Sequence, residues 1–121
     1  MYIGEVSQRT GLSAKAIRLY EEMGLIRTLP RVNRYRTYAE TDIEVLQLIA
    51  EAKQLGVTLN RLKGVIRYQH GVVDWARIHQ FLKDVRGELM AERQRLNAQI
   101  QQVEQCLATI HTCPQGLDSV L

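Results

Sequence analysis

Residues 31–38, RVNRYRTY, concentrate side chains that can bind an anion. The segment holds three arginines and two tyrosines: Arg31, Arg34, Arg36, Tyr35 and Tyr38. A guanidinium group is always charged and presents five N–H donors in a plane that matches the oxygens of a phosphate. Phenol hydroxyls can add neutral hydrogen bonds, and the rings can brace a short hairpin. The segment is therefore suited to holding a phosphate backbone.

Positive charge gathers in the N-terminal third of the 121-residue chain. Residues 1–37 carry seven Lys or Arg against three acids, a local net charge of +4. Residues 38–80 are balanced at five each, and residues 81–121 carry four bases against five acids. Such an asymmetry indicates a polyanionic partner, of which nucleic acid is the commonest. A solvated basic surface without a partner is the alternative that charge alone leaves open.

The composition is typical of one compact globular unit, with 45% hydrophobic and 24% charged residues. Two cysteines are too few to staple a secreted miniprotein, which favours a reduced, cytoplasmic protein. The N-terminus lacks the basic and apolar regions of a signal peptide, and no apolar run approaches the roughly 18 residues of a membrane span. No nucleophile, base and orienting group come together in the sequence, so we expect neither an enzyme nor a membrane partner.

Two short helices are predicted before the arginine-rich segment. Residues 3–10 have helical periodicity, and Gly11 can end this helix in the left-handed conformation that glycine adopts without strain. Ser13 is a suitable N-cap for a second helix, which Gly24 closes. A helix, a tight turn and a second helix within about 22 residues are typical of a helix-turn-helix.

The segment after the second helix predicts a small hairpin and two further helices. Pro30 and Asn33 lie between short β-prone stretches, which indicates a two-stranded hairpin, or wing. Helical periodicity resumes over residues 43–50 and again over residues 59–66. These two helices are expected to provide the core of the winged unit.

The last predicted helix carries an apolar heptad, and Asp74 can cap its start near Trp75. Five apolar residues follow at intervals of seven: Leu82, Leu89, Leu96, Val103 and Ile110. A strict period of seven over roughly 35 residues is typical of a coiled-coil seam, which one small domain cannot bury. We therefore expect an antiparallel homodimer, in which a two-fold axis pairs the seam with itself. A parallel pairing is also compatible with the period.

Three stretches, taken in order, resemble a family of bacterial regulators: IGEVSQRTGLSAKAIRLYEEMGLI, RVNRYRTY and DIEVLQLIAEAKQLGVTLNRLKGVI. Over residues 2–69 the chain resembles the MerR family, and it departs from the family's wing pattern at Arg34, where glycine is usual. The resemblance implies a mainly α fold in three parts. These are a winged helix-turn-helix DNA-binding domain over residues 1–70, a dimerisation helix forming an antiparallel coiled coil over residues 71–112, and an effector-loop remnant over residues 113–121.

The resemblance also implies a function: a sequence-specific transcriptional regulator that acts as a homodimer on double-stranded promoter DNA, with RNA polymerase as a further partner. It assigns Lys15 and Arg18 to the major groove, and Tyr20 to a DNA backbone contact or to packing. The implied DNA-binding residues are Lys15, Arg18, Tyr20, Arg31, Arg34, Tyr35 and Arg36. A coiled-coil adaptor without DNA binding is the alternative from another class.

The effector is left unknown by the sequence. Cys113 matches the first metal thiolate of the copper- and zinc-responsive subgroup of the family, but the second cysteine expected about seven or eight residues later is absent. One thiolate completes neither a two-sulfur copper site nor a four-ligand zinc site without further donors. Candidate donors are His111, Cys106 and the partner's His79, although Cys106 also suits a buried thiol of the seam. A metal-responsive sensor is therefore the alternative to a regulator with another effector or none.

Overall fold

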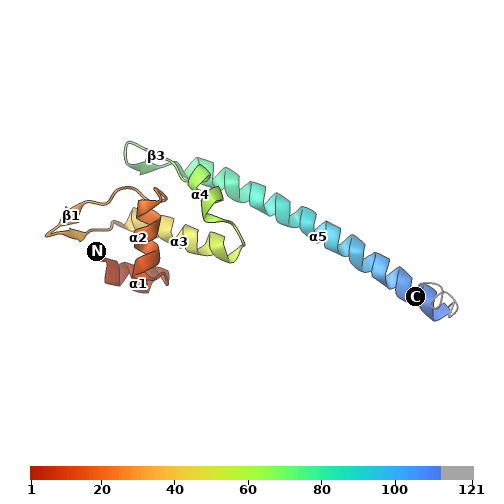
Figure 1. Ribbon diagram of the computed structural model, residues 1–121. Helices are drawn as coiled ribbons and strands as arrows, with labels where there is room; N and C mark the ends of the chain where they lie inside the picture. The colour runs from red at the N-terminus through yellow and green to blue at the C-terminus, as the bar shows by residue number, and fades with distance from the viewer. Residues whose placement is uncertain (113–121) are drawn as a thin grey trace. The chain divides into compact units, whose positions relative to one another are not determined.

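The computed structural model describes residues 1–112, and the side chains of residues 1–110 (Figure 1). The helices are α1 (Ile3–Thr10), α2 (Ala14–Glu22), α3 (Glu40–Gln54), α4 (Leu59–Val65) and α5 (Trp75–Thr112), and the strands are β1 (Arg31–Val32), β2 (Tyr35–Arg36), β3 (Tyr68–Gln69) and β4 (Val72–Val73). The chain divides into two units, residues 1–79 and the chain from residue 80 onward. The mainly helical fold is the one that the sequence predicts.

Helices α1 and α2 form the predicted helix-turn-helix. Helix α1 ends at Gly11, whose φ of 73° is left-handed and whose N–H donates to the Ser7 carbonyl at 3.0 Å. The Ser13 hydroxyl accepts a hydrogen bond from the Ala16 N–H at 3.1 Å, which caps α2 as predicted. Each helix turns an apolar side towards the interior, and the buried side chains are Val6, Ile17 and Tyr20.

Helix α3 carries most of the core of the first unit. Its residues Ile43, Leu46 and Ile49 are at most 1% exposed, and Leu62 of α4 is fully buried. Burial of one such aliphatic side chain contributes about 1.5–3 kcal/mol. Because α1 packs against both α2 and α3, this core fixes the helix-turn-helix in place.

The first hairpin is the predicted wing. Strands β1 and β2 pair antiparallel, with Arg31 opposite Arg36 and Val32 opposite Tyr35. The two turn residues both have left-handed backbones, with φ values of 51° at Asn33 and 70° at Arg34. This is a two-residue turn of the I′ kind, whose twist matches that of the strands and whose second position favours glycine.

The second hairpin, β3 and β4, is missing from the sequence-based prediction, which placed only a break at Gly71. Tyr68 pairs with Val73 and Gln69 with Val72, and the turn residue His70 has a left-handed φ of 53°. The strands are two residues long, so the alternation that marks a strand in a sequence has no room to develop.

The first unit extends nine residues beyond the boundary predicted at residue 70. The second hairpin and the first turn of α5 belong to it, because Val73 and Ile78 are 7% and 3% exposed. A boundary after residue 70 would fall inside the second hairpin, between its two strands.

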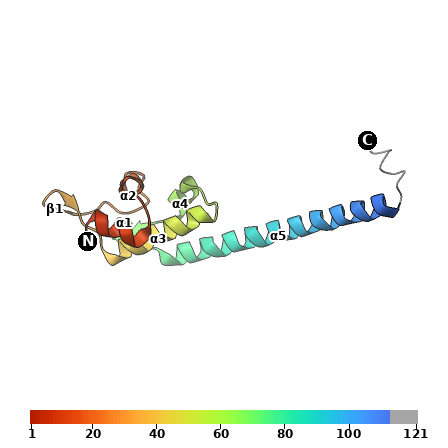
Figure 2. The same cartoon turned by 90° about the horizontal axis from the view of Figure 1, so that it is seen from below.

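Helix α5 begins where the sequence predicts. The Asp74 carboxylate accepts a hydrogen bond from the Arg77 N–H at 3.2 Å, and the helix then continues for 38 residues, without a break in Figure 2. The five heptad residues Leu82, Leu89, Leu96, Val103 and Ile110 remain 37–57% exposed in the single chain. None of the described helices, α5 included, combines the length and apolarity needed to cross a membrane.

Candidate nucleic-acid interface

Helix α2 presents two cations on its outer face. Ile17 and Tyr20 point inward and are at most 1% exposed, so residues one or two positions away turn to solvent. Lys15 and Arg18 are both exposed. They border one shallow hollow, whose other lining residues are Ser13, Ala16, Leu19 and Glu22.

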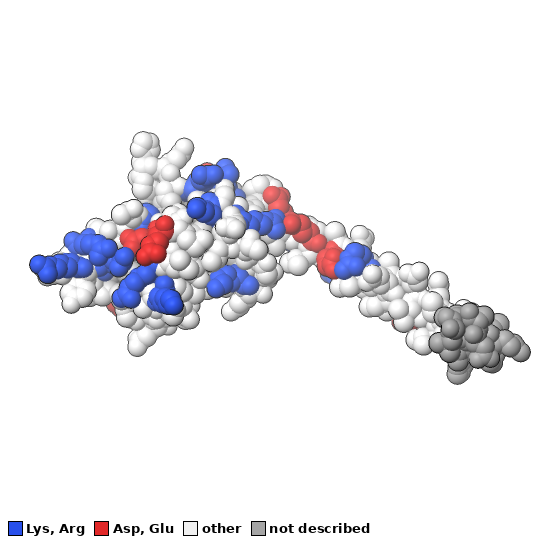
Figure 3. Space-filling view, in the orientation of Figure 1, with Lys and Arg blue, Asp and Glu red and all other residues white. Residues whose placement is uncertain are grey.

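The wing presents further cations beside α2. Arg31, Arg34 and Tyr35 are exposed, and Figure 3 shows Lys and Arg atoms gathered at this end of the first unit. Arg36, in contrast, is half-buried. Its Nε donates to the carboxylate of Glu21 on α2, and this ion pair raises the pKa of Arg36. Glu21 uses its other oxygen to accept a hydrogen bond from the Leu29 N–H at 2.9 Å. One carboxylate therefore ties α2 to the segment before β1 and to β2.

Ion pairing separates the basic residues of the N-terminal third into two groups. Three arginines are bound by carboxylates: Arg9 by Glu40 at 2.8 Å, Arg27 by Asp42 at 2.8 Å, and Arg36 by Glu21. The other four basic residues, which form no ion pair with a described residue, are Lys15, Arg18, Arg31 and Arg34. All four lie on α2 or the wing, so the unpaired positive charge of the N-terminal third is confined to this face.

The Arg27–Asp42 pair has a structural role and is not part of the exposed basic face. Asp42 is 1% exposed, and its two oxygens accept hydrogen bonds from Nε and Nη2 of Arg27, both at 2.8 Å. The same carboxylate accepts the Ala39 N–H at 2.8 Å and caps α3. A buried carboxylate needs such partners, because an unpaired one would cost several kcal/mol.

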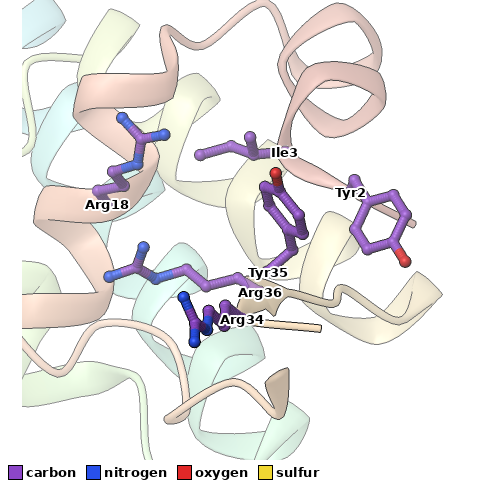
Figure 4. A pocket seen from close by; sticks show the side chains of 6 residues that line it. All are labelled: Tyr2, Ile3, Arg18, Arg34, Tyr35 and Arg36. Atoms are coloured by element: carbon purple, nitrogen blue, oxygen red, sulfur yellow. The ribbon is translucent and has the colours of Figure 1, made fainter. Parts of the chain in front are cut away.

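A cavity of about 260 Å³ lies between α2, the wing and the start of α1 (Figure 4). Its lining comprises Tyr2, Ile3, Arg18, Arg34, Tyr35 and Arg36. The rings of Tyr2 and Tyr35 meet edge to face, with centroids 6.0 Å apart and planes at 64°. This contact joins the wing to the start of α1 and gives the cavity an aromatic wall.

Six of the seven predicted DNA-binding residues lie on this face, and Tyr20 does not. Tyr20 is 1% exposed, and its hydroxyl accepts a hydrogen bond from the Nζ of Lys53 at 3.4 Å. The expectation of a DNA contact at Tyr20 is therefore wrong, and the alternative of packing is what the structure shows. Tyr38 is also buried, at 3% exposure, and burial raises its pKa.

Two residues of the site were missed by sequence reasoning. Glu21 positions Arg36 although the two lie fifteen residues apart in the sequence, and Tyr2, near the N-terminus, packs against Tyr35 of the wing. Neither pairing follows from helical or strand periodicity, because both depend on tertiary packing. The sequence signal for Glu21 was the pair of adjacent acids, Glu21 and Glu22, on a helix whose other exposed charges are basic, since a carboxylate there needs a structural reason.

The described part of the chain does not assemble a metal site. Cys106 is exposed on α5, beside the apolar residues Val103, Leu107 and Ile110. His79 lies 27 residues earlier on the same helix, so one copy of the helix cannot bring both to one ion. Within residues 1–110 no three His, Cys, Asp or Glu side chains are grouped for an ion. The side chain of His111 and the whole of Cys113 lie outside the described residues.

A helix-turn-helix followed by a wing, with unpaired cations on both, defines the class of winged helix-turn-helix DNA-binding folds. Within this class, the chain belongs to the MerR HTH family of regulatory proteins, whose sequence profile matches residues 1–69. It is therefore a transcriptional regulator of the MerR type, as the sequence resemblance implied.

Two relatives and one solved structure illustrate the match. The chain is 35% identical over 108 residues to "Heavy metal-dependent transcription regulator 2" of Rhizobium meliloti (strain 1021), covering 88% of this chain and 71% of that protein. It is 36% identical over 121 residues to "HTH-type transcriptional regulator CueR" of Salmonella typhi, covering 98% and 85%. The crystal structure of HiNmlR, a MerR family regulator lacking the sensor domain and bound to promoter DNA, shares the fold with a TM-score of 0.53 at 17% identity, covering 89% of this chain and 78% of that one.

Proposed function

We propose that this regulator binds a two-fold symmetric promoter site as a homodimer, with α2 in the major groove and the wing on the adjacent backbone. The observation that carries the proposal concerns the basic residues of positions 1–37: the four that form no ion pair with a described residue, Lys15, Arg18, Arg31 and Arg34, all lie on one face. The role is non-enzymatic and cytoplasmic, and RNA polymerase is the further partner at the promoter.

The two elements of the face contribute differently. A helix fits the major groove, where an arginine can read a guanine through two hydrogen bonds to its O6 and N7 atoms. Arg18, at the exposed centre of α2, is our candidate for such a contact, with Lys15 beside it. Phosphate contacts fix orientation without reading sequence, and this role suits Arg31, Arg34 and Arg36 of the wing, together with the hydroxyl of Tyr35.

The homodimer is supported by the heptad on α5. Five apolar side chains at a strict period of seven remain 37–57% exposed in the single chain, which leaves a stripe that a second copy can cover. An antiparallel pair places the two seams around a two-fold axis, and such an axis gives the DNA site its symmetry. We propose the seam residues Leu82, Leu89, Leu96, Val103 and Ile110 as the dimer contact.

The proposal is tested by selecting bound duplexes from a random-sequence pool with the full chain. We expect enrichment of an inverted repeat, which fluorescence anisotropy then compares with a scrambled duplex. Arg18→Ala should reduce the preference for the selected duplex by about 1–3 kcal/mol, whereas Lys83→Ala, an exposed cation on α5, should leave it unchanged. Equal preference in Arg18→Ala and the wild type would contradict the assignment of Arg18. A pool without any enriched sequence would instead favour the coiled-coil adaptor.

A second candidate, a response to a metal ion, is supported by the relative from Rhizobium meliloti, which is named "Heavy metal-dependent transcription regulator 2". Cys113 would be the first donor, and Cys106, His111 and the partner's His79 would have to complete the set. The test is to load the reduced full chain with monovalent copper or zinc and to measure bound metal and transcription. Stoichiometric, thiol-dependent binding that alters transcription and is lost in Cys113→Ser would establish this candidate. Its absence leaves a regulator with another effector or none.

A further inference from the structure

Arg34 occupies a backbone position that favours glycine. It is the second residue of the two-residue turn of the wing, and its φ of 70° lies in the left-handed region. Turns of this kind prefer glycine there, because any Cβ is strained. The second hairpin of the same chain has the same design, and its turn places Gly71, with a φ of 77°, at the corresponding position.

The Arg34 side chain forms no contact within the fold that would offset this strain. It is exposed and forms no side-chain hydrogen bond or ion pair with a described residue. Only its backbone carbonyl is used, as a weak acceptor for Nη1 of Arg31 at 3.5 Å. A strained residue whose side chain stabilises nothing in the fold indicates a functional role.

The place that Arg34 reaches is the cavity of about 260 Å³ between the wing and α2. Arg18 enters the same cavity from α2, and Arg36 enters from β2 (Figure 4). The Arg36 side chain is fixed in position, because its Nε donates a hydrogen bond to Glu21. The remaining lining residues are Tyr2, Ile3 and Tyr35, so three arginine side chains and no carboxylate line the cavity.

We infer that this cavity seats one phosphate group of the DNA backbone, and that Arg34 is the residue that completes the seat. The inference rests on the proposed function and deepens it by naming the atom group that meets the junction of α2 and the wing. A phosphate offers two anionic oxygens, which guanidinium groups bind through pairs of short, charge-assisted hydrogen bonds. Arg18 lies at the border between the helix that reads bases and this seat, because it also lines the cavity. Arg34 fixes the wing against the helix once DNA is bound.

The test compares Arg34→Gly with Arg34→Lys in the full chain, on the selected duplex. Each lost phosphate contact reduces the magnitude of the negative slope of log K against log salt by about 0.9. A dimer carries two seats, so Arg34→Gly should reduce this magnitude by about 1.8. Between about 50 and about 200 mM salt, the wild type should therefore lose about 12-fold more affinity than Arg34→Gly loses. Arg34→Lys should keep most of the slope, and Lys83→Ala all of it.

Thermal unfolding separates this role from a structural one. Because glycine suits the turn, Arg34→Gly should melt no lower than the wild type while it binds DNA more weakly. An unchanged slope and affinity for duplex DNA in Arg34→Gly would overturn the inference. It would also be overturned if Arg34→Gly weakened the binding of inorganic phosphate but left the binding of duplex DNA unchanged. A wild type that selects no duplex would instead refute the proposed function, so the two failures are distinguishable.

Discussion

Replacement of Leu96 by lysine should separate the proposed dimer. Leu96 is the central residue of the heptad and is 44% exposed in the single chain, so about half of its side chain is left for a partner to cover. Full burial of a leucine is worth about 1.5–3 kcal/mol, and the uncovered half is therefore worth about 1 kcal/mol per copy. Two copies lose about 2 kcal/mol even when the lysine ammonium groups reach water along their flexible stems.

Desolvation of the charge adds to this loss. An ammonium group that cannot reach water costs about 2 kcal/mol or more per copy, which brings the total to about 6 kcal/mol for the pair. The dissociation constant of the dimer should accordingly rise by about 30-fold at the lower limit and about 20,000-fold at the upper one. DNA affinity should fall with it, because a monomer holds only one half of a symmetric site.

Sedimentation equilibrium over a dilution series measures this change. Ala98→Lys is the matched control, since it adds the same charge two residues along α5 at an exposed position outside the heptad. The control should stay dimeric at concentrations where Leu96→Lys is monomeric. Equal dissociation constants for the two variants would refute the seam, and a monomeric wild type would refute the dimer itself.

Two further predictions concern the support of the wing and the second hairpin. Glu21→Gln removes the charge that binds Arg36, so urea unfolding should show a loss of about 1–2 kcal/mol in the free energy of unfolding. Burial raises the pKa of Tyr68 to about 12 from its ordinary value of 10.0. The folded protein therefore holds the phenol proton more tightly than the unfolded chain, and the stability should fall as pH rises from about 10 towards about 12. Tyr68→Phe should lose less stability over this range, and an identical decline in the two proteins, followed by denaturant unfolding, would contradict the burial of the phenol.

The local elements were predictable because single residues mark their ends. Gly11 and Ser13 enclose the turn of the helix-turn-helix, and Asp74 caps α5, as backbone conformation and side-chain acceptors require. The wing was predictable from its turn residues, and Arg34 adopts the left-handed backbone although its position favours glycine. The turn is therefore imposed by the pairing of β1 with β2, and not by the residue alone.

What the sequence did not show depends on contacts between distant segments. The direction of Tyr20 could not be decided from its place on α2, since both outcomes fit a helix that is buried on one side only. The choice of Arg36, rather than Arg31, as the partner of Glu21 requires the wing to be folded against α2. The hairpin around Gly71 is too short to leave a periodic signal, and it is held by packing of Val73 in the core.

We propose that the face formed by α2 and the wing binds DNA in two symmetric copies. Hydroxyl-radical footprinting of the full chain on the selected duplex tests this most directly, because it reports backbone contacts at single-nucleotide resolution. We expect two protected blocks related by a two-fold axis, both weakened by Arg34→Gly and unchanged by Lys83→Ala. A single protected block, or protection that is uniform along the duplex, would contradict it.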